Sequence, residues 1–524
     1  MSMDRLATNE LSLTRDLIAN LFGMCREGVT EVRAIARDRL ESHPAVLAPD
    51  RPLRPRRFGL DHSLPEGYHR TRSRPSPRIC DDMQRHRNLI RDEANLRSDD
   101  RVPRDKAPNG LFLGKLGPGV ITGAADDDPS GIATYSQGGA QFGYSLLWTL
   151  FFTYPLMVGI QVVSARIGRV SGYGLAGNIR RHYPPWVLYG LVSLLLVANT
   201  FNIGADLRAM ADATALLIGG SRHAYILGFG LFCVMLQIYF SYARYVRVLK
   251  WLTLSLFAYV GVVFSVDLPW LDVIRGVFVP SLSTNATYLT TVVAIFGTTI
   301  SPYLFFWQAS QECEDIRAVK ADRPLRDHPD QAARHLARIK VDTYIGMGFS
   351  NLIAFFIMLT TAATLHTHGV IDVQTSAQAA EALRPIAGKF AFLLFSMGIV
   401  GTGLLAVPVL AGSAAFAVAE SFRWRQGLDL TPLRGARFYG VIAAATLVGV
   451  GLGFTPLDPI KALFYAAVIN GVISPPIMLV MMRMVSNPTI MGAFIVTRRL
   501  RVLGWVSTTV MAVAVAAMFV QMLS

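Results

Sequence analysis

A long series of apolar segments is the feature that most limits what this chain can fold into. From Gly114 onward, apolar runs of roughly 18–25 residues follow one another, which is the length that a helix needs to cross a bilayer. The composition agrees, because 52% of the 524 residues are hydrophobic and only 16% are charged, whereas a soluble chain carries more surface charge. The sequence therefore predicts an all-α polytopic membrane protein.

The number of spans and their direction follow from the loops. With the N-terminus placed inside, the inner loops carry 22 Lys and Arg residues and the outer loops carry five. Cytoplasmic loops collect Lys and Arg, so this asymmetry predicts a cytoplasmic N-terminus. It also accounts for the net charge of +14 without a nucleic-acid partner, and we expect none. The eleven predicted spans are 115–138, 144–166, 186–215, 223–240, 245–266, 289–311, 342–365, 388–417, 437–455, 460–483 and 502–522.

Residues 1–110 differ from everything after them. They hold 21 Lys and Arg against 17 Asp and Glu and contain no long apolar run or signal-peptide-like segment. We predict a basic, largely disordered cytoplasmic region there, followed by a transmembrane domain over 111–524 in the cell (inner) membrane. Neither a disulfide framework nor a zinc site is expected from the four scattered cysteines, Cys25, Cys80, Cys233 and Cys313.

The first span contains a helix break beside three acids. The stretch GAADDDPSGIATYSQ places Asp126, Asp127 and Asp128 directly before Pro129. Proline lacks a backbone N–H and disfavours helix in the residue before it. We expect the helix to stop near Asp126–Asp128 and to restart around Ile132, which frees the carbonyl groups of Ala124 and Ala125.

The sixth span is interrupted in the same way. Gly297 and Pro302 lie within AIFGTTISPYLFFWQ and are expected to free the carbonyls near Thr298 and Thr299. Broken segments at matching positions of two halves, spans 1–5 and 6–10, indicate a midplane site in an inverted-repeat transporter. Carboxylates at membrane depth are costly and usually functional. Beside free carbonyls they form an oxygen-lined site of the kind that a hard divalent cation prefers.

These stretches resemble a known family. LGPGVITGAADDDPSGIATYSQGGAQFGYSLLWTLFFTYPLMVGIQVVSARIG resembles the first two spans of the NRAMP family of divalent metal transporters. FGTTISPYLFFWQASQE is similar to its sixth span, and PPIMLVMMRMVSNPTIMG to its tenth. The resemblance covers about 110–524. It implies a LeuT-type fold with a five-plus-five inverted repeat, broken helices 1 and 6, and alternating access in the bilayer. It implies no enzyme activity and no cofactor besides the transported ion.

The resemblance also assigns site residues. The family's DPGN motif falls on residues 128–131, so Asp128 matches the metal-binding aspartate and Ala125 the residue that offers a carbonyl, while the asparagine ligand is replaced by Gly131. In the sixth span, Thr298 keeps a carbonyl position. The family's methionine ligand is replaced by Ser301 and its histidine by Tyr303.

The replacements favour a hard ion. A thioether favours soft or borderline metals, and Ser301 lacks one. Mg²⁺ keeps several waters and uses one or two carboxylates, which suits Asp128 with Asp127 or Asp126. Adjacent helix positions point about 100° apart, so Asp126 is also interpreted as an outer-shell or cavity-rim charge. The pattern resembles the NRAMP-related magnesium transporter branch and favours Mg²⁺ or Mn²⁺ over Fe²⁺.

Proton coupling is expected to be weak or absent. In typical members the sixth-span histidine and two third-span acids form the proton route, and here these positions hold Tyr303, Ile203 and Asp206. A tyrosine with an ordinary pKa near 10 is a poor proton carrier at neutral pH. Two structural alternatives stay open: Asp206 pairs with Arg208 or a loop arginine instead of relaying protons, and Ser301 only caps or packs the helix break.

Other functions remain possible from the sequence. One alternative is a proton-coupled Mn²⁺/Fe²⁺ transporter of the same family. Another is a non-metal solute carrier of the same fold, although three acids at the break argue against an anionic substrate group. A sensor that signals through its N-terminal region is a third. An intramembrane prenyltransferase needs a second acidic cluster on a facing helix, and no other span has one.

Overall fold

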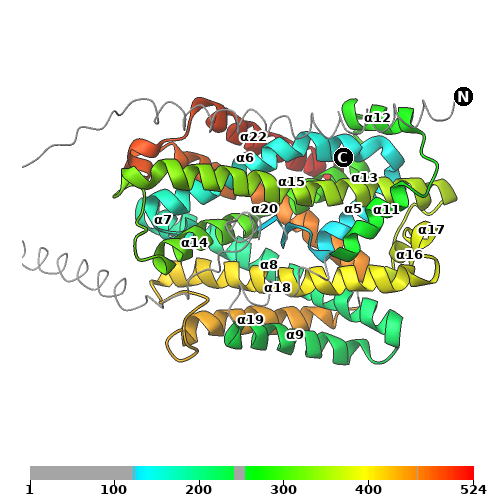
Figure 1. The fold of residues 1–524 in the computed structure, drawn as a ribbon, viewed down its shortest axis with the longest axis horizontal. Helices are drawn as coiled ribbons and strands as arrows, with labels where there is room; N and C mark the ends of the chain where they lie inside the picture. Colours follow the sequence, from blue (N-terminus) through cyan, green and yellow to red (C-terminus); the bar gives the residue numbers. More distant parts are fainter. Residues whose placement is uncertain (1–121, 124, 241–253, 457, 524) are drawn as a thin grey trace, which may run out of the picture. The chain divides into compact units, whose positions relative to one another are not determined.

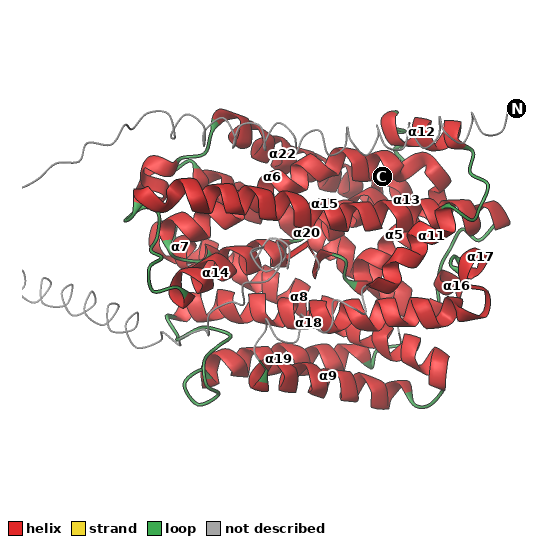
Figure 2. Ribbon diagram, in the orientation of Figure 1, coloured by secondary structure: helices red, strands yellow, loops and turns green. Residues whose placement is uncertain are grey.

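The computed structural model describes residues 122–123, 125–240, 254–456 and 458–523, and the predictions for residues 1–110 lie outside this part. Every regular element in the described part is helical, and no strand occurs there (Figure 2). The predicted all-α class is therefore confirmed. Residues 125 and 126 end a first half-helix that precedes α5.

The described helices run in the following order. They are α5 (Pro129–Phe142), α6 (Leu147–Ser171), α7 (Leu175–His182), α8 (Pro185–Ile218), α9 (Arg222–Tyr239), α11 (Phe257–Val263), α12 (Trp270–Phe278), α13 (Ala286–Thr299), α14 (Pro302–Ala318), α15 (Ala332–Thr364), α16 (Ser376–Glu381), α17 (Arg384–Ala387), α18 (Ala391–Phe422), α19 (Ala436–Gly453), α20 (Pro459–Val485), α21 (Pro488–Met491) and α22 (Arg498–Leu523).

Nine stretches of the described residues are long and apolar enough to cross a membrane, with α5 and α6 counted as one stretch and α13 and α14 as another. Of the fifth predicted span, 245–266, the described residues begin at 254 and contain a shorter apolar helix, Leu254–Val263. The seventh span starts earlier than predicted, because α15 begins at Ala332 instead of 342. Its first turns are rich in Ala, Leu and Arg, which are strong helix formers.

The long helices pack as a bundle that surrounds the two breaks (Figure 1). Helix α8 packs against α18, α19 and α20, while α5 packs against α15 and α20. Helices α9 and α19 lie side by side at the lower edge of Figure 1. The break between α5 and the preceding half-helix thus lies among α8, α14 and α15, each of which contributes a side chain to it.

The contact between α13 and α20 depends on glycine. A Cβ on Gly297 would meet the carbonyl oxygen of Ala467 and the backbone of Gly471, so Gly297→Ala is expected to lower the free energy of unfolding by about 1–3 kcal/mol through overpacking. Gly440→Ala is the matched control, since no described residue beyond its own helical backbone and chain neighbours has an atom within 4 Å of its added Cβ. It should be neutral or stabilising by up to about 1 kcal/mol. Thermal unfolding in detergent measures both; equal melting temperatures would contradict the close contact.

Candidate functional site

The first helix break is shorter than predicted. Helix α5 restarts at Pro129, not around Ile132, and only Asp127 and Asp128 lie outside helix. The reason is local: Asp128 has an extended backbone (φ −72°, ψ 168°), and its side chain accepts a hydrogen bond from the backbone N–H of Gly131. Aspartate is a preferred N-cap, and proline is favoured at the first helical position. The proline therefore begins the second half-helix.

The second break lies between Thr299, which ends α13, and Pro302, which begins α14. Ser301 lies in it, with its Oγ 2.9 Å from the carbonyl oxygen of Gly297 and 2.7 Å from that of Thr298. The carbonyl of Ile300 accepts a hydrogen bond of 2.9 Å from Ser474 of α20. In this conformation Ser301 caps the end of α13, and its single hydroxyl hydrogen bonds one of these two carbonyls at a time, of which that of Thr298 was expected to be free.

Asp128 is buried, with 1% of its surface exposed, and both of its oxygens accept hydrogen bonds. Oδ1 accepts from Ser130 Oγ at 2.6 Å and from Gly131 N at 2.7 Å. Oδ2 accepts from Asn202 Nδ2 at 3.2 Å, and Tyr303 OH lies 3.3 Å away. The sequence thus places Asp128 correctly at the break, and the fold surrounds it with four polar groups.

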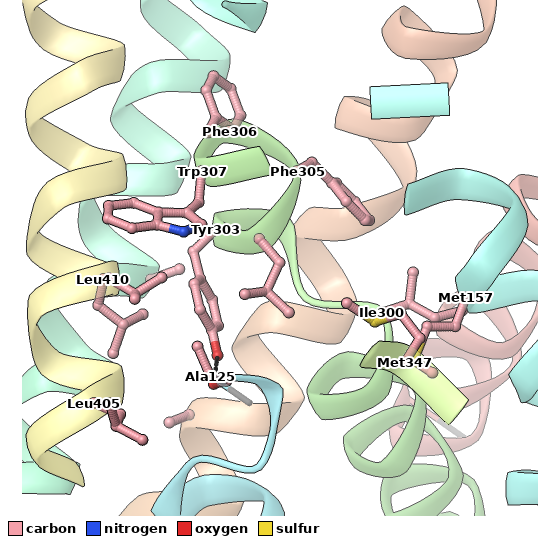
Figure 3. Close-up of a cluster of buried hydrophobic side chains, with 14 of the residues drawn as sticks. Ala125, Met157, Ile300, Tyr303, Phe305, Phe306, Trp307, Met347, Leu405 and Leu410 are labelled. Carbon is pink, nitrogen blue, oxygen red and sulfur yellow. Dashed lines mark hydrogen bonds between the residues drawn. The ribbon is translucent and has the colours of Figure 1, made fainter. Parts of the chain in front are cut away.

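Tyr303 links the two breaks. Its hydroxyl lies 3.0 Å from the carbonyl oxygen of Ala125, and Figure 3 shows the ring pointing from α14 toward that residue. The carbonyl of Ala125, which was expected to be free, accepts a hydrogen bond from Tyr303. Ala124, the other residue of that prediction, lies outside the described residues. The rings of Phe305, Phe306 and Trp307 are buried in the core beyond Tyr303 (Figure 3). Tyr303 is therefore the aromatic residue of this run that offers a polar group to the site.

Asp126 and Asp127 contact a different helix. Ser350 of α15 has its Oγ 2.7 Å from Asp126 Oδ2 and 2.9 Å from Asp127 Oδ1. The first half-helix and α15 approach closely here, since Gly123 has no side chain: a Cβ on Gly123 would meet the backbone of Gly346, one turn before Ser350. Both aspartates are buried, and the remaining oxygen of Asp126, Oδ1, has no hydrogen-bond partner among the described residues.

Thr298 and Gly131 face each other across the two breaks. The Thr298 hydroxyl is buried and has no hydrogen-bond partner within the part of the chain that the structure describes. A Cβ on Gly131 would lie 3.2 Å from this oxygen and 3.3 Å from the ring of Tyr135. A side chain at position 131 would thus point at Thr298. Because residue 131 is glycine, α5 offers no side-chain ligand atom beside the Thr298 hydroxyl.

Asp206 of α8 is fully buried, and neither of its oxygens has a hydrogen-bond partner in the described part of the chain. It lies one helical turn after Asn202, which binds Asp128, so both residues are on the same face of α8. The alternative that Asp206 pairs with Arg208 is wrong. Arg208 instead donates to the carbonyl oxygens of Gly453 and Thr455, at 2.9 and 2.5 Å.

The acids do not form one preformed cluster. Among the described residues, no group of three or more His, Cys, Asp or Glu side chains is arranged to hold a metal ion. Nor does any ion pair within these ranges involve Asp126, Asp127, Asp128 or Asp206. Sequence reasoning missed Ser350 and the role of Asn202. The spacing of four residues between Asn202 and Asp206 is a weak sequence signal for Asn202, and nothing in the sequence singles out Ser350.

Two helix breaks and a group of buried carboxyls in a bundle of membrane-spanning helices define the class of multi-pass membrane transporters. Comparison with known proteins narrows this to a family. The family model described as natural resistance-associated macrophage protein-like, Nramp, matches residues 119–521. The chain belongs to the Nramp family.

Similar proteins agree with this assignment. The chain is 28% identical over 412 residues to the divalent metal cation transporter MntH of Deinococcus radiodurans, covering 76% of this chain and 88% of that protein. It is 24% identical to MntH of Caldanaerobacter subterraneus, over 75% and 89% of the two chains. These relatives are named as transporters, not as enzymes.

The fold also matches solved structures. The Eremococcus coleocola manganese transporter, in complex with an aromatic bis-isothiourea substituted compound, has a TM-score of 0.61 at 18% identity over 80% of this chain and 88% of that one. MhsT in complex with L-phenylalanine has a TM-score of 0.52 at 13% identity over 77% and 97%. The predicted LeuT-type fold is therefore confirmed.

Proposed function

We propose that the chain imports a divalent metal cation, Mg²⁺ or Mn²⁺, by alternating access at the two helix breaks. The observation that carries this is the set of buried carboxyls at the first break, with no basic partner in the described ranges, in a family whose similar members are named divalent metal cation transporters. We place the protein in the cell membrane with a cytoplasmic N-terminus, residues 1–110 as a cytoplasmic region and 111–524 as the transporter domain.

The proposed ligands are Asp128, Asp127, Asp126 and Ser301 through side chains, with Ala125 and Thr298 through carbonyls. In the described conformation, Oδ2 of Asp128 and the carbonyl of Ala125 both contact Tyr303. Ion binding therefore requires the Tyr303 hydroxyl to move, after which both oxygens turn to the cation. All six groups offer oxygen, which suits a hard ion that keeps part of its water.

One observation favours a second candidate, proton-coupled transport of Mn²⁺ or Fe²⁺. Asp206 is buried near the site and has no hydrogen-bond partner in the described ranges, and an intramembrane carboxyl of this kind often belongs to a proton relay. We nevertheless propose transport without protons, because Tyr303 stands where the family has a histidine. The two candidates differ in whether the internal pH falls during uptake.

Uptake by purified protein in liposomes tests the proposal and its selectivity. The wild type should take up Mg²⁺ and Mn²⁺, with Fe²⁺ a poor competitor. Ser301→Met adds a thioether and should shift preference toward Mn²⁺ over Mg²⁺ by about tenfold, at the lower end of effects from residues around metal ligands. Ser301→Ala removes the same hydroxyl without adding sulfur and should shift it little. Absence of uptake of every divalent ion would refute the proposal.

A further inference from the structure

The first turn of α22 carries a concentration of positive charge. Arg498, Arg499 and Arg501 lie in it, and it contains no acidic residue. The N-terminal end of a helix is itself positive, so cations are unfavourable there and anions are stabilised. Within the described ranges, none of these three arginines takes part in an ion pair. The described part of the chain therefore leaves their charge without a counter-charge.

The neighbouring helices supply no acid either. Helix α22 packs against α6, α13 and α20, and it lies beside α6 in Figure 1. None of these four helices contains Asp or Glu, and residues 459–524 contain none at all. Asp327, in the loop before α15, lies 3.9 Å from Arg326 of the same loop, so this pair adds no net charge. An anion at the start of α22 has to come from outside the described protein.

Helix α6 brings a fourth arginine to the same level. A Cβ on Gly159 would meet Leu503 of α22. Further along α6, the carbonyl of Val170 accepts from the backbone N–H of Arg326, whose side chain donates to the segment before α22. The two helices are therefore antiparallel. Arg166 lies about two turns after Gly159 on the same face, level with the start of α22, and its buried Nε has no hydrogen-bond partner among the described residues.

An apolar groove follows α22 from this basic end. It has a volume of about 380 Å³ and is lined by Arg501, Val502, Trp505, Val506, Thr509 and Val510. The helix rises about 13 Å from the first to the last of these residues, close to the roughly 15 Å of one hydrocarbon leaflet. Tryptophan beside a basic residue is typical of the membrane–water interface. The groove thus combines a cationic mouth with an apolar length that suits an acyl chain.

We propose that the basic end of α22 and its groove bind an anionic phospholipid of the cytoplasmic leaflet. The headgroup contacts Arg498, Arg499 and Arg501, and one acyl chain lies along the groove. Basic pockets on the cytoplasmic side of transmembrane helices bind such headgroups. The inference rests on the orientation given under the proposed function, in which α22 begins at the cytoplasmic side. It does not depend on which ion is transported.

Lipid binding by the full-length protein in detergent tests this proposal. The protein is titrated with anionic phosphatidylglycerol or with zwitterionic phosphatidylcholine, and bound lipid is counted by native mass spectrometry. Each arginine near an anionic headgroup favours binding about fivefold, so the wild type should prefer phosphatidylglycerol on the order of 100-fold. The triple variant Arg498→Gln/Arg499→Gln/Arg501→Gln should lose this preference.

Two further variants show whether the site is specific. The matched control Arg423→Gln/Arg425→Gln/Arg434→Gln removes three exposed arginines that follow α18, and it should keep the preference. Val506→Trp fills the groove without a change in charge. It should weaken binding of phosphatidylglycerol about tenfold, the effect of leaving two methylenes of the chain exposed, and should not change binding of glycerol phosphate, which has no chain.

Three outcomes would overturn the inference. They are an equal loss of preference in the two triple variants, no preference in the wild type, and glycerol phosphate that binds as tightly as phosphatidylglycerol. Divalent cation uptake in phosphatidylcholine liposomes is measured separately, so a wild type that takes up the ion but shows no lipid preference refutes this inference and leaves the proposed function intact. If the basic triple variant aggregates, Arg501→Gln alone decides, with an expected loss of about fivefold.

Discussion

Asp128→Asn is expected to lower divalent cation uptake more than about 100-fold, above the 10–100-fold range of residues that only surround a metal ligand. The substitution removes the charge but keeps a side-chain oxygen that accepts from the N–H of Gly131, as Asp128 Oδ1 does at 2.7 Å. Asparagine and aspartate are about equally good N-caps. The start of α5 should therefore persist, and the melting temperature of the apo protein should stay close to that of the wild type.

Asp128→Ala separates the two roles of this residue. It removes both the charge and the cap. Uptake should therefore fall as much as in Asp128→Asn, and the free energy of unfolding should also fall by about 1 kcal/mol. Uptake into liposomes and thermal unfolding measure the two effects, with Asp267→Asn as the exposed control. If Asp128→Asn keeps more than half of the uptake, Asp128 is a structural cap and not a ligand.

The sequence places the helix breaks well, because proline acts locally. Pro129 and Pro302 lack a backbone donor wherever they stand, and both breaks occur beside them. Helix α5 begins three residues before the predicted Ile132, because Asp128 is its N-cap and Pro129 its first residue. This start follows from local chemistry and requires no tertiary contact.

The partners of the site residues depend on packing between distant helices. Ser350 reaches Asp126 and Asp127 only because Gly123 lies against the backbone of Gly346, and no local pattern encodes that register. The pairing of Asp206 with Arg208 does not occur, and the reason is local. Residues two apart on a helix do not face each other, and Arg208 satisfies carbonyls near the end of α19 instead.

Membrane potential, and not a pH gradient, is expected to drive uptake. A cation of charge +2 gains about 4.6 kcal/mol from an inside-negative potential of 100 mV, which corresponds to a concentration ratio on the order of 10³ at equilibrium. In liposomes with a potassium diffusion potential, Mg²⁺ should accumulate by a large factor. An inward proton gradient of one pH unit at zero potential should change initial uptake less than about twofold, where one coupled proton would contribute about 1.4 kcal/mol.

The reason lies in the residues around Tyr303. Its hydroxyl contacts the carbonyl of Ala125 and the carboxyl of Asp128, and a phenol is too weak an acid to exchange its proton readily at neutral pH. Asp206 is then the remaining acid at the positions of the family's proton route, and Asp206→Asn tests directly whether it carries protons. If internal pH falls as the ion enters and this variant abolishes the change, protons accompany the metal through Asp206. If the potential-driven uptake is the same in wild type and variant with constant internal pH, the buried carboxyl has no part in coupling.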